Sequence, residues 1–217
     1  MITSLVPVLD HIASVSTVTV ALDRVGNSWP WYITRAAGFI AAGLLVLLMF
    51  SGIGQVTGII YRYIEPIKVW AIHKALAIAL CISIVLHASF LLVDKYLPFS
   101  LAQILVPFAS HYNNGTQIGG LALGELAVTF GILAAYGVVI VVASALGWIN
   151  KNRTWRKLHY ISYAVIILVL VHGMYVGTDL KYGIFRTLWI GVGVLIVLAV
   201  IVRLWRKGTV KKALENS

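Results

Sequence analysis

Four of the six histidines in this sequence form two pairs with almost equal spacing. His87 follows His73 by fourteen residues, and His172 follows His159 by thirteen. At 1.5 Å per helical residue, each separation is about 20 Å, most of the hydrocarbon thickness of a bilayer. An ionisable side chain is rare in a transmembrane helix unless it pairs, binds a ligand or lines a path. These four residues are therefore the first candidates for chemistry.

The segments that carry these histidines are long and apolar. Hydrophobic residues make up 60% of the 217 residues and charged residues 11%, and the mean hydropathy is +0.94, which excludes a soluble globular domain. The pattern predicts an all-α, polytopic membrane bundle with five transmembrane helices, at about 31–53, 70–93, 120–148, 158–178 and 184–205.

Three regions follow from this pattern. We expect a helical bundle at 29–207, a basic tail at 208–217 and an N-terminal segment at 1–28. The N-terminal segment lacks the positive region of a signal peptide. It is short for a membrane span, so we expect it to lie in the membrane interface, with a sixth helix as the alternative.

The positive charges indicate an orientation. The net charge is +10, and most Lys and Arg residues fall in two connections and the tail. Because cytoplasmic loops concentrate Lys and Arg, we expect a multi-pass protein of the plasma membrane with a cytoplasmic C-terminus. The charges then anchor the chain to anionic lipid and do not indicate nucleic-acid binding. They are Arg62, Lys68 and Lys74, then Lys151, Arg153, Arg156 and Lys157, then Arg203, Arg206, Lys207, Lys211 and Lys212.

The histidines are expected at two depths. With one helix between them, the second and fourth spans run in the same direction, so His73 and His159 share the cytoplasmic level and His87 and His172 the outer level. Two imidazoles at one depth on neighbouring helices are what a haem iron needs for two axial ligands. Such an iron has no vacant site, which suits electron transfer. The plainer alternative for any single histidine is a hydrogen-bonded packing residue.

One detail does not follow from a regular helix. At 100° per residue, His73 and His87 point within about 40° of each other, whereas His159 and His172 are about 140° apart. Helix tilt, a local irregularity near Ser162 or Gly173, or haems held from different sides would absorb the difference.

Other residues fit a cofactor-bearing bundle. Small residues allow close approach of helices or of a macrocycle at Gly38, Gly43, Gly131, Gly137 and Gly173. Haem propionates need cationic partners. The candidates are Arg62, Lys68, Lys74, Arg156 and Lys157 at the cytoplasmic level and Arg35 at the outer level, and each of them is alternatively a plain interface anchor.

Two further residues belong to the outer side. His111 lies in the connection 95–119, which would overhang the outer site and contact an electron acceptor. Glu125 is the only acidic residue inside an expected span, where it faces loop water or accepts a proton.

The segment from Trp31 to Leu180 resembles the ferric reductase-like transmembrane domain. That family includes ferric reductases, NADPH oxidases and the haem-binding subunit of a methionine sulfoxide reductase system. The resemblance rests on the two histidine spacings, on the opening Trp31-Tyr32-Ile33-Thr34-Arg35-Ala36-Ala37-Gly38 and on Trp155-Arg156-Lys157-Leu158-His159. It implies two haems b, an inner one on His73 and His159 and an outer one on His87 and His172.

The sequence also departs from the larger family members. They carry a flavin and nicotinamide module after the last helix, whereas no Gly-rich dinucleotide motif follows Arg203 here. We therefore expect the membrane haem component of an oxidoreductase, fed by a quinol or by a separate flavoprotein that brings the flavin. The electrons would leave to an acceptor on the outer face.

Two other functions are compatible with parts of the pattern. One is a haem-free transporter or proton relay that uses the histidines, which would need acidic partners near them. The other is a structural subunit of a larger membrane complex.

Overall fold

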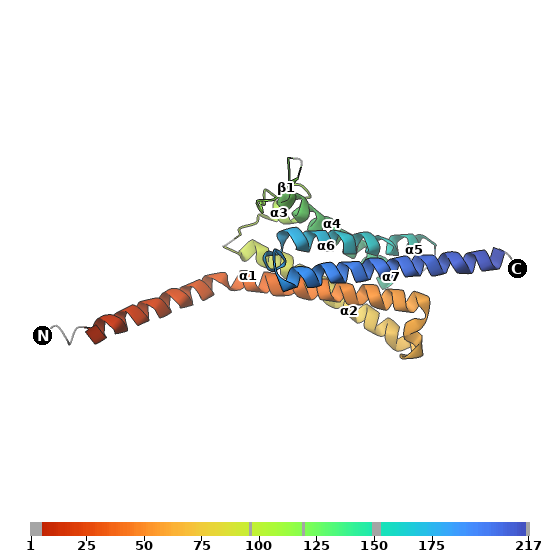
Figure 1. Ribbon diagram of the computed structural model, residues 1–217, viewed down its shortest axis with the longest axis horizontal. Coiled ribbons are helices and arrows are strands. Elements are labelled where there is room, and N and C mark those ends of the chain that lie inside the picture. The colour runs from red at the N-terminus through yellow and green to blue at the C-terminus, as the bar shows by residue number, and fades with distance from the viewer. Residues whose placement is uncertain (1–5, 96, 119, 149–152, 216–217) are drawn as a thin grey trace.

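The computed structural model describes residues 6–215 except 96, 119 and 149–152, and it describes side chains mainly between residues 28 and 205. The chain is helical almost throughout (Figure 1). Among the described residues, five helical segments are long and apolar enough to cross a membrane: Ser28–Thr57, Pro66–Val93, Leu123–Leu146, Arg153–Val176 and Ile184–Trp205. The predicted all-α membrane bundle with five transmembrane helices is therefore confirmed.

Two helical hairpins form the bundle. The first joins α1 (Val6–Thr57) to α2 (Pro66–Val93) through the short 3-10 helix η1 (Ile59–Arg62). The second joins α4 (Leu123–Ala143), through the π-helical turn η2 (Ser144–Trp148), to α5 (Arg153–His159) and α6 (Ile161–Val176). The closest packing is within each hairpin, α1 against α2 and α4 against α6.

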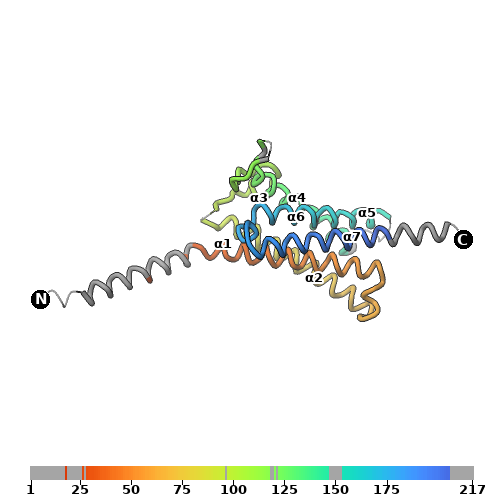
Figure 2. Tube along the Cα trace, viewed as in Figure 1, coloured from red at the N-terminus to blue at the C-terminus, as the bar shows by residue number. Residues whose placement is uncertain are grey.

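The last helix completes the bundle. Helix α7 (Ile184–Glu215) follows the 3-10 turn η3 (Thr178–Leu180) and contacts both α1 and α6. The tube in Figure 2 follows the two hairpins and α7 along one common axis. The core draws residues from all five spans: Leu45, Met49, Leu80, Ala134, Val138, Val165, Ile166 and Ile196.

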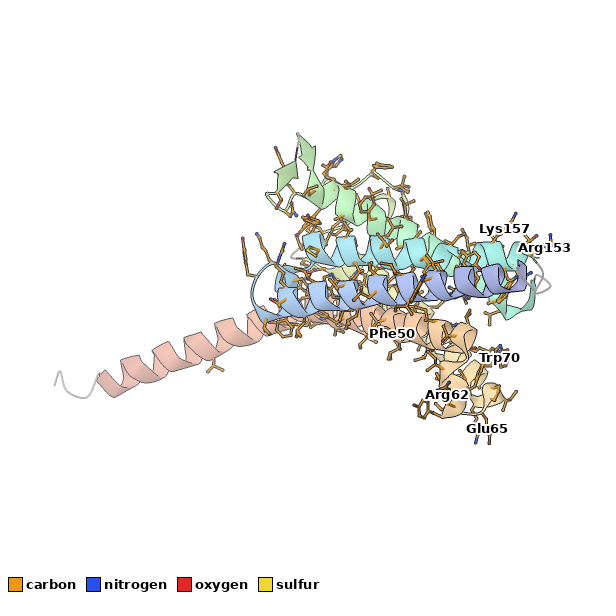
Figure 3. The ribbon with its side chains drawn as sticks, turned by 45° about the vertical axis from the view of Figure 1, so that its right-hand side comes forward. Phe50, Arg62, Glu65, Trp70, Arg153 and Lys157 are labelled. Atoms are coloured by element: carbon orange, nitrogen blue, oxygen red, sulfur yellow. The ribbon has the colours of Figure 1, made fainter. Side chains whose placement is uncertain are left out.

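The two ends of the bundle differ. One end, which we call the basic end, carries η1 and α5, and the side chains of Arg62, Arg153 and Lys157 project there (Figure 3). The opposite end, which we call the loop end, carries α3 (Leu101–Leu105) and the hairpin of β1 (Gln117–Ile118) and β2 (Leu121–Ala122), as Figure 1 shows. The sequence did not predict these three short elements of the long connection.

Local sequence explains where the first hairpin turns. Helix α1 ends before Gly58, which adopts a left-handed φ of 74° that few other residues tolerate. Helix α2 begins with Pro66 in its first turn, where the missing N–H costs nothing. Helix α1 extends back to Val6, but the side chains of most residues before Ser28 lie outside the described part. An interfacial or membrane-crossing N-terminal segment thus stays a prediction.

Candidate functional site

The loop-end pair joins the two hairpins. His87 in α2 and His172 in α6 have ring centroids 6.3 Å apart, with ring planes at 84°. The Nδ1–H of His87 donates to the carbonyl of Thr34 in α1 at 2.8 Å, and the Nδ1–H of His172 donates to the carbonyl of Ala127 in α4 at 2.8 Å. Because a carbonyl only accepts, both rings must carry the proton on Nδ1. Nε2 is left with a free lone pair on each ring.

Glycines make room for these two rings. A Cβ at Gly38 would lie 3.0 Å from Nδ1 of His87, and a Cβ at Gly131 would lie 2.5 Å from Nδ1 of His172. Each glycine stands four residues after the residue whose carbonyl accepts the histidine proton. Both rings therefore lie directly on a neighbouring helix. The predicted close approach also occurs at Gly137 and Gly173, whereas nothing lies within 4 Å of a Cβ built at Gly43.

The basic-end pair has the same spacing and different partners. The ring centroids of His73 in α2 and His159 in α5 are 6.4 Å apart. The hydroxyl of Ser51 donates to the carbonyl of Leu48 and lies 2.7 Å from Nδ1 of His73, so it accepts the proton of that nitrogen. Nδ1 of His159 is buried without a hydrogen-bond partner among the described residues, and its ring stacks on Trp155 at 5.1 Å.

The second hairpin is locally irregular between His159 and His172. Helix α5 ends at His159 and α6 starts at Ile161, with a turn at Tyr160 between them. The N–H of Tyr160 is shared between the carbonyls of Arg156 and Lys157, and the hydroxyl of Ser162 bonds to the carbonyl of His159. A local irregularity near Ser162, one of the three explanations for the 140° mismatch, is therefore present, while the backbone of Tyr160 keeps right-handed helical angles.

The two pairs have a spacing that suits one metal ion each. Imidazole–metal bonds of about 2 Å, with a ring radius of about 1.2 Å on each side, give a centroid separation of about 6.4 Å. No group of three or more His, Cys, Asp or Glu side chains gathers within the described part of the chain. The donor set is thus two imidazoles per site, which fits a metal whose other ligands come from a macrocycle such as haem.

Comparison with known proteins gives the family. The family model described as the ferric reductase like transmembrane component matches residues 37–171, more than half of the chain. The chain belongs to this family. The match includes His73, His87 and His159 and ends directly before His172. No curated protein and no solved structure matches the chain. Membership indicates a role in transmembrane electron transfer.

The ferric reductase-like domain has a cavity at the loop-end pair. Its walls come from all five spans and include His87, His172 and the glycines beside them, with a mainly apolar lining. Polar residues lie at its outer end, among them Arg35, Asp94 and Tyr112. Burial raises the pKa of Tyr112, so its phenol stays neutral. These residues fit a haem: a mainly apolar cavity, two free imidazole nitrogens and a polar mouth.

Some of the expected cations at this mouth and at the basic end pair with acidic residues, and the others are exposed. Arg35 donates through Nε to Asp179 at 2.8 Å, pairs with the same carboxylate through Nη2, and lies over the ring of Trp31 at 4.0 Å. Lys68 pairs with Glu65 at 3.1 Å in an exposed contact. The other expected cations, namely Arg62, Lys74, Arg156 and Lys157, are exposed.

The sequence analysis missed one cation. The sequence pattern groups Arg203 of α7 with the basic tail, but its guanidinium lies over the rings of Tyr160 and Tyr163, beside His159. Its apolar surroundings, Ile201-Val202 before it and Leu204-Trp205 after it, were the available signal.

The structure also brings together the two residues expected on the outer side. Nδ1 of His111 lies 3.8 Å from the carboxylate of Glu125, and His111 is 84% exposed. This pair is separate from the two histidine pairs and lies at the surface of the loop end.

Proposed function

We propose that this protein carries electrons across the plasma membrane through two b-type haems. His73 and His159 would hold one haem near the basic end, and His87 and His172 the other near the loop end. The single observation that carries the proposal is the geometry of the pairs. Two histidine pairs at two depths have nearly equal ring separations, 6.4 and 6.3 Å, each suited to one iron. When bound, a haem of this kind supplies one-electron transfer at an iron without a vacant site.

The direction follows from the charge. Lys and Arg are concentrated at the basic end, and such ends face the cytoplasm. We infer that electrons enter near His73 and His159 and leave near His87 and His172. The exposed cations Arg153, Arg156 and Lys157 suit an acidic flavoprotein as electron donor, with a membrane quinol as the alternative.

The role of the surrounding residues is to hold the ligands. The carbonyls of Thr34 and Ala127 and the hydroxyl of Ser51 fix the proton on Nδ1 of three histidines, so that Nε2 is available to the metal. Partners of this kind also raise the basicity of the ligand. Arg35 stands at the mouth of the loop-end cavity, where it would contact the polar edge of a haem.

The alternative function, a proton relay without haem, has less support. A relay needs acidic or hydroxyl groups that pass protons between histidines. The described hydrogen bonds of His87 and His172 go to backbone carbonyls. A backbone carbonyl accepts a hydrogen bond but does not take up a proton and pass it on. Hydrogen bonds to helix carbonyls therefore suit histidines held as metal ligands better than histidines that form a proton path.

The test is spectroscopic. A reduced-minus-oxidised spectrum of the purified chain should show a low-spin b-type signal, and its absence would end the proposal. Each of His73→Ala, His87→Ala, His159→Ala and His172→Ala should lose about one haem of two. Redox titration should then show that the first and third variants lose one centre and the second and fourth lose the other. His111→Ala, an exposed histidine outside both pairs, should keep the full haem content.

A further inference from the structure

Arg203 occupies an unusual place in the last transmembrane helix. Its neighbours Ile201, Val202, Leu204 and Trp205 are all at least 48% exposed, as expected for a face toward lipid. Arg203 itself is partly buried and faces the rest of the bundle. A cation so close to the hydrocarbon is costly unless it has a functional or structural partner.

The partners of Arg203 lie beside the basic-end site. The centre of its guanidinium is 5.5 Å from the ring centroid of Tyr160 and 5.1 Å from that of Tyr163. The two rings stack on each other at 6.1 Å. Tyr160 directly follows His159, and the guanidinium lies within electrostatic range of that histidine. Two aromatic faces thus hold the cation next to one of the expected haem ligands.

No carboxylate pairs with Arg203 among the side chains that the structure describes. The contrast is Arg35, whose guanidinium pairs with the carboxylate of Asp179 at the other end. Ring faces interact with the positive charge but take few of the five N–H groups of a guanidinium. Arg203 therefore retains donors for an anion with two oxygens, and a guanidinium binds a carboxylate through two parallel hydrogen bonds.

We propose that Arg203 binds a propionate carboxylate of the haem held by His73 and His159. This inference rests on the proposed function and assigns a binding role to α7, which lies beyond the residues matched by the family model. The competing explanation is purely structural: Arg203 would hold α7 against the turn at Tyr160 and contact no ligand.

Haem and its dimethyl ester separate these explanations, because the ester has no carboxylate. The full-length His172→Ala chain, expressed without haem supply, keeps only the basic-end site and is titrated with each porphyrin. Arg203→Gln should weaken haem binding by about 10- to 100-fold, the effect of losing a hydrogen bond to a charged group. The same change should leave ester binding within about twofold. Arg203→Lys keeps the positive charge but lacks the bidentate geometry, so its haem affinity should lie between those of Arg203 and Arg203→Gln.

Arg153→Gln is the matched control, since it removes one exposed cation from the same end. It should change neither titration. Equal weakening of haem and ester by Arg203→Gln would show a structural role and overturn the inference, as would no weakening of either. If the His172→Ala chain is unstable, the pH dependence of the basic-end midpoint potential in the otherwise unmodified chain replaces the titration, and an unchanged dependence in Arg203→Gln counts against the inference. Failure of the unmodified chain to bind any haem would instead reject the proposed function.

Discussion

At the scale of single residues, both loop-end histidines are positioned by the same device. A carbonyl accepts the Nδ1 proton, and a glycine one turn later leaves space for the ring: Thr34 with Gly38 for His87, and Ala127 with Gly131 for His172. In a helix, residues four apart lie on one face, so any side chain at the second position would stand where the imidazole lies. The bond and the space are therefore two parts of one requirement.

This requirement predicts the effect of adding a methyl group. In Gly131→Ala the new Cβ would lie 2.5 Å from Nδ1 of His172, closer than van der Waals contact allows, so the ring must move. We expect loss of about one haem of two, at the loop end, because the ligand leaves its position. Haem stoichiometry with a redox titration measures it.

The size of the effect should follow the available space. Gly38→Ala, with a distance of 3.0 Å to His87, should retain more haem than Gly131→Ala. Gly43→Ala, where nothing lies within 4 Å of the new Cβ, should retain all of it. Full haem content in Gly131→Ala would show that the ring position is not needed for ligation.

The hydroxyl of Ser51 gives a second prediction, for the basic end. Ser51→Ala removes the acceptor of the His73 Nδ1 proton, so the ring loses its fixed tautomer and orientation. Loss of such a partner typically weakens metal binding by about 10- to 100-fold. Haem transfer from the variant to apomyoglobin should be faster by that order.

Ser83→Ala is the matched control for Ser51→Ala. Ser83 is a buried serine whose hydroxyl bonds only to the backbone of its own helix, at Ala79. Its removal should leave the transfer rate unchanged. Equal acceleration in both variants would attribute the effect to loosened helices.

Some of these single-residue features could be predicted from the sequence. The histidine pairs and the role of small residues were predictable because spacing and residue type are local information. The carbonyl partners of His87 and His172, and Ser51 as the partner of His73, were not, because they depend on how one helix lies against another. Arg203 was misread although its apolar neighbours were visible in the sequence, because a Lys/Arg count cannot distinguish a tail charge from one turned into the bundle.

At the scale of elements, the turn at Tyr160 shows where pattern reasoning stops. Helical periodicity revealed that His159 and His172 could not share a face of one regular helix, and it placed the irregularity near Ser162 among the options. Periodicity alone could not single out this irregularity, because residues 157–163 contain neither Pro nor Gly. In the structure, α5 packs against α4 and α6 of its own hairpin there.

The ion pair of Arg35 with Asp179 makes the third prediction. It ties α1 to η3, the turn that leads into α7, and both side chains are less than one-third exposed. Asp179→Asn removes the charge that faces Arg35. A charged hydrogen bond in this setting contributes about 1–3 kcal/mol, so we expect a lower midpoint in thermal unfolding followed by tryptophan fluorescence.

A double-mutant cycle with Arg35→Gln isolates this pair. The coupling energy of Arg35 and Asp179 should be about 1–3 kcal/mol. The exposed pair of Lys68 and Glu65 should show a coupling energy near zero. Equal coupling in the two cycles would mean that the loop-end contact does not fasten α1 to η3.

At the scale of the whole molecule, the five spans were predictable because a bilayer imposes both length and composition on a helix. The two hairpins give the molecule its main property. Each places one histidine near the basic end and one near the loop end, so the two sites are assembled between hairpins and not within either. Under the proposed function, transfer across the membrane requires both sites at once.

Vesicles test this requirement. With ferricyanide trapped inside and a membrane-impermeant reductant such as dithionite outside, the haem-loaded chain should bleach the ferricyanide. His73→Ala and His172→Ala should each abolish the transfer, because either loss leaves a gap of most of the hydrocarbon thickness in the path. Gly43→Ala, which faces open space, should keep the rate. Transfer that persists in either histidine variant would show that one centre suffices, and electrons would not have to pass both histidine pairs in series.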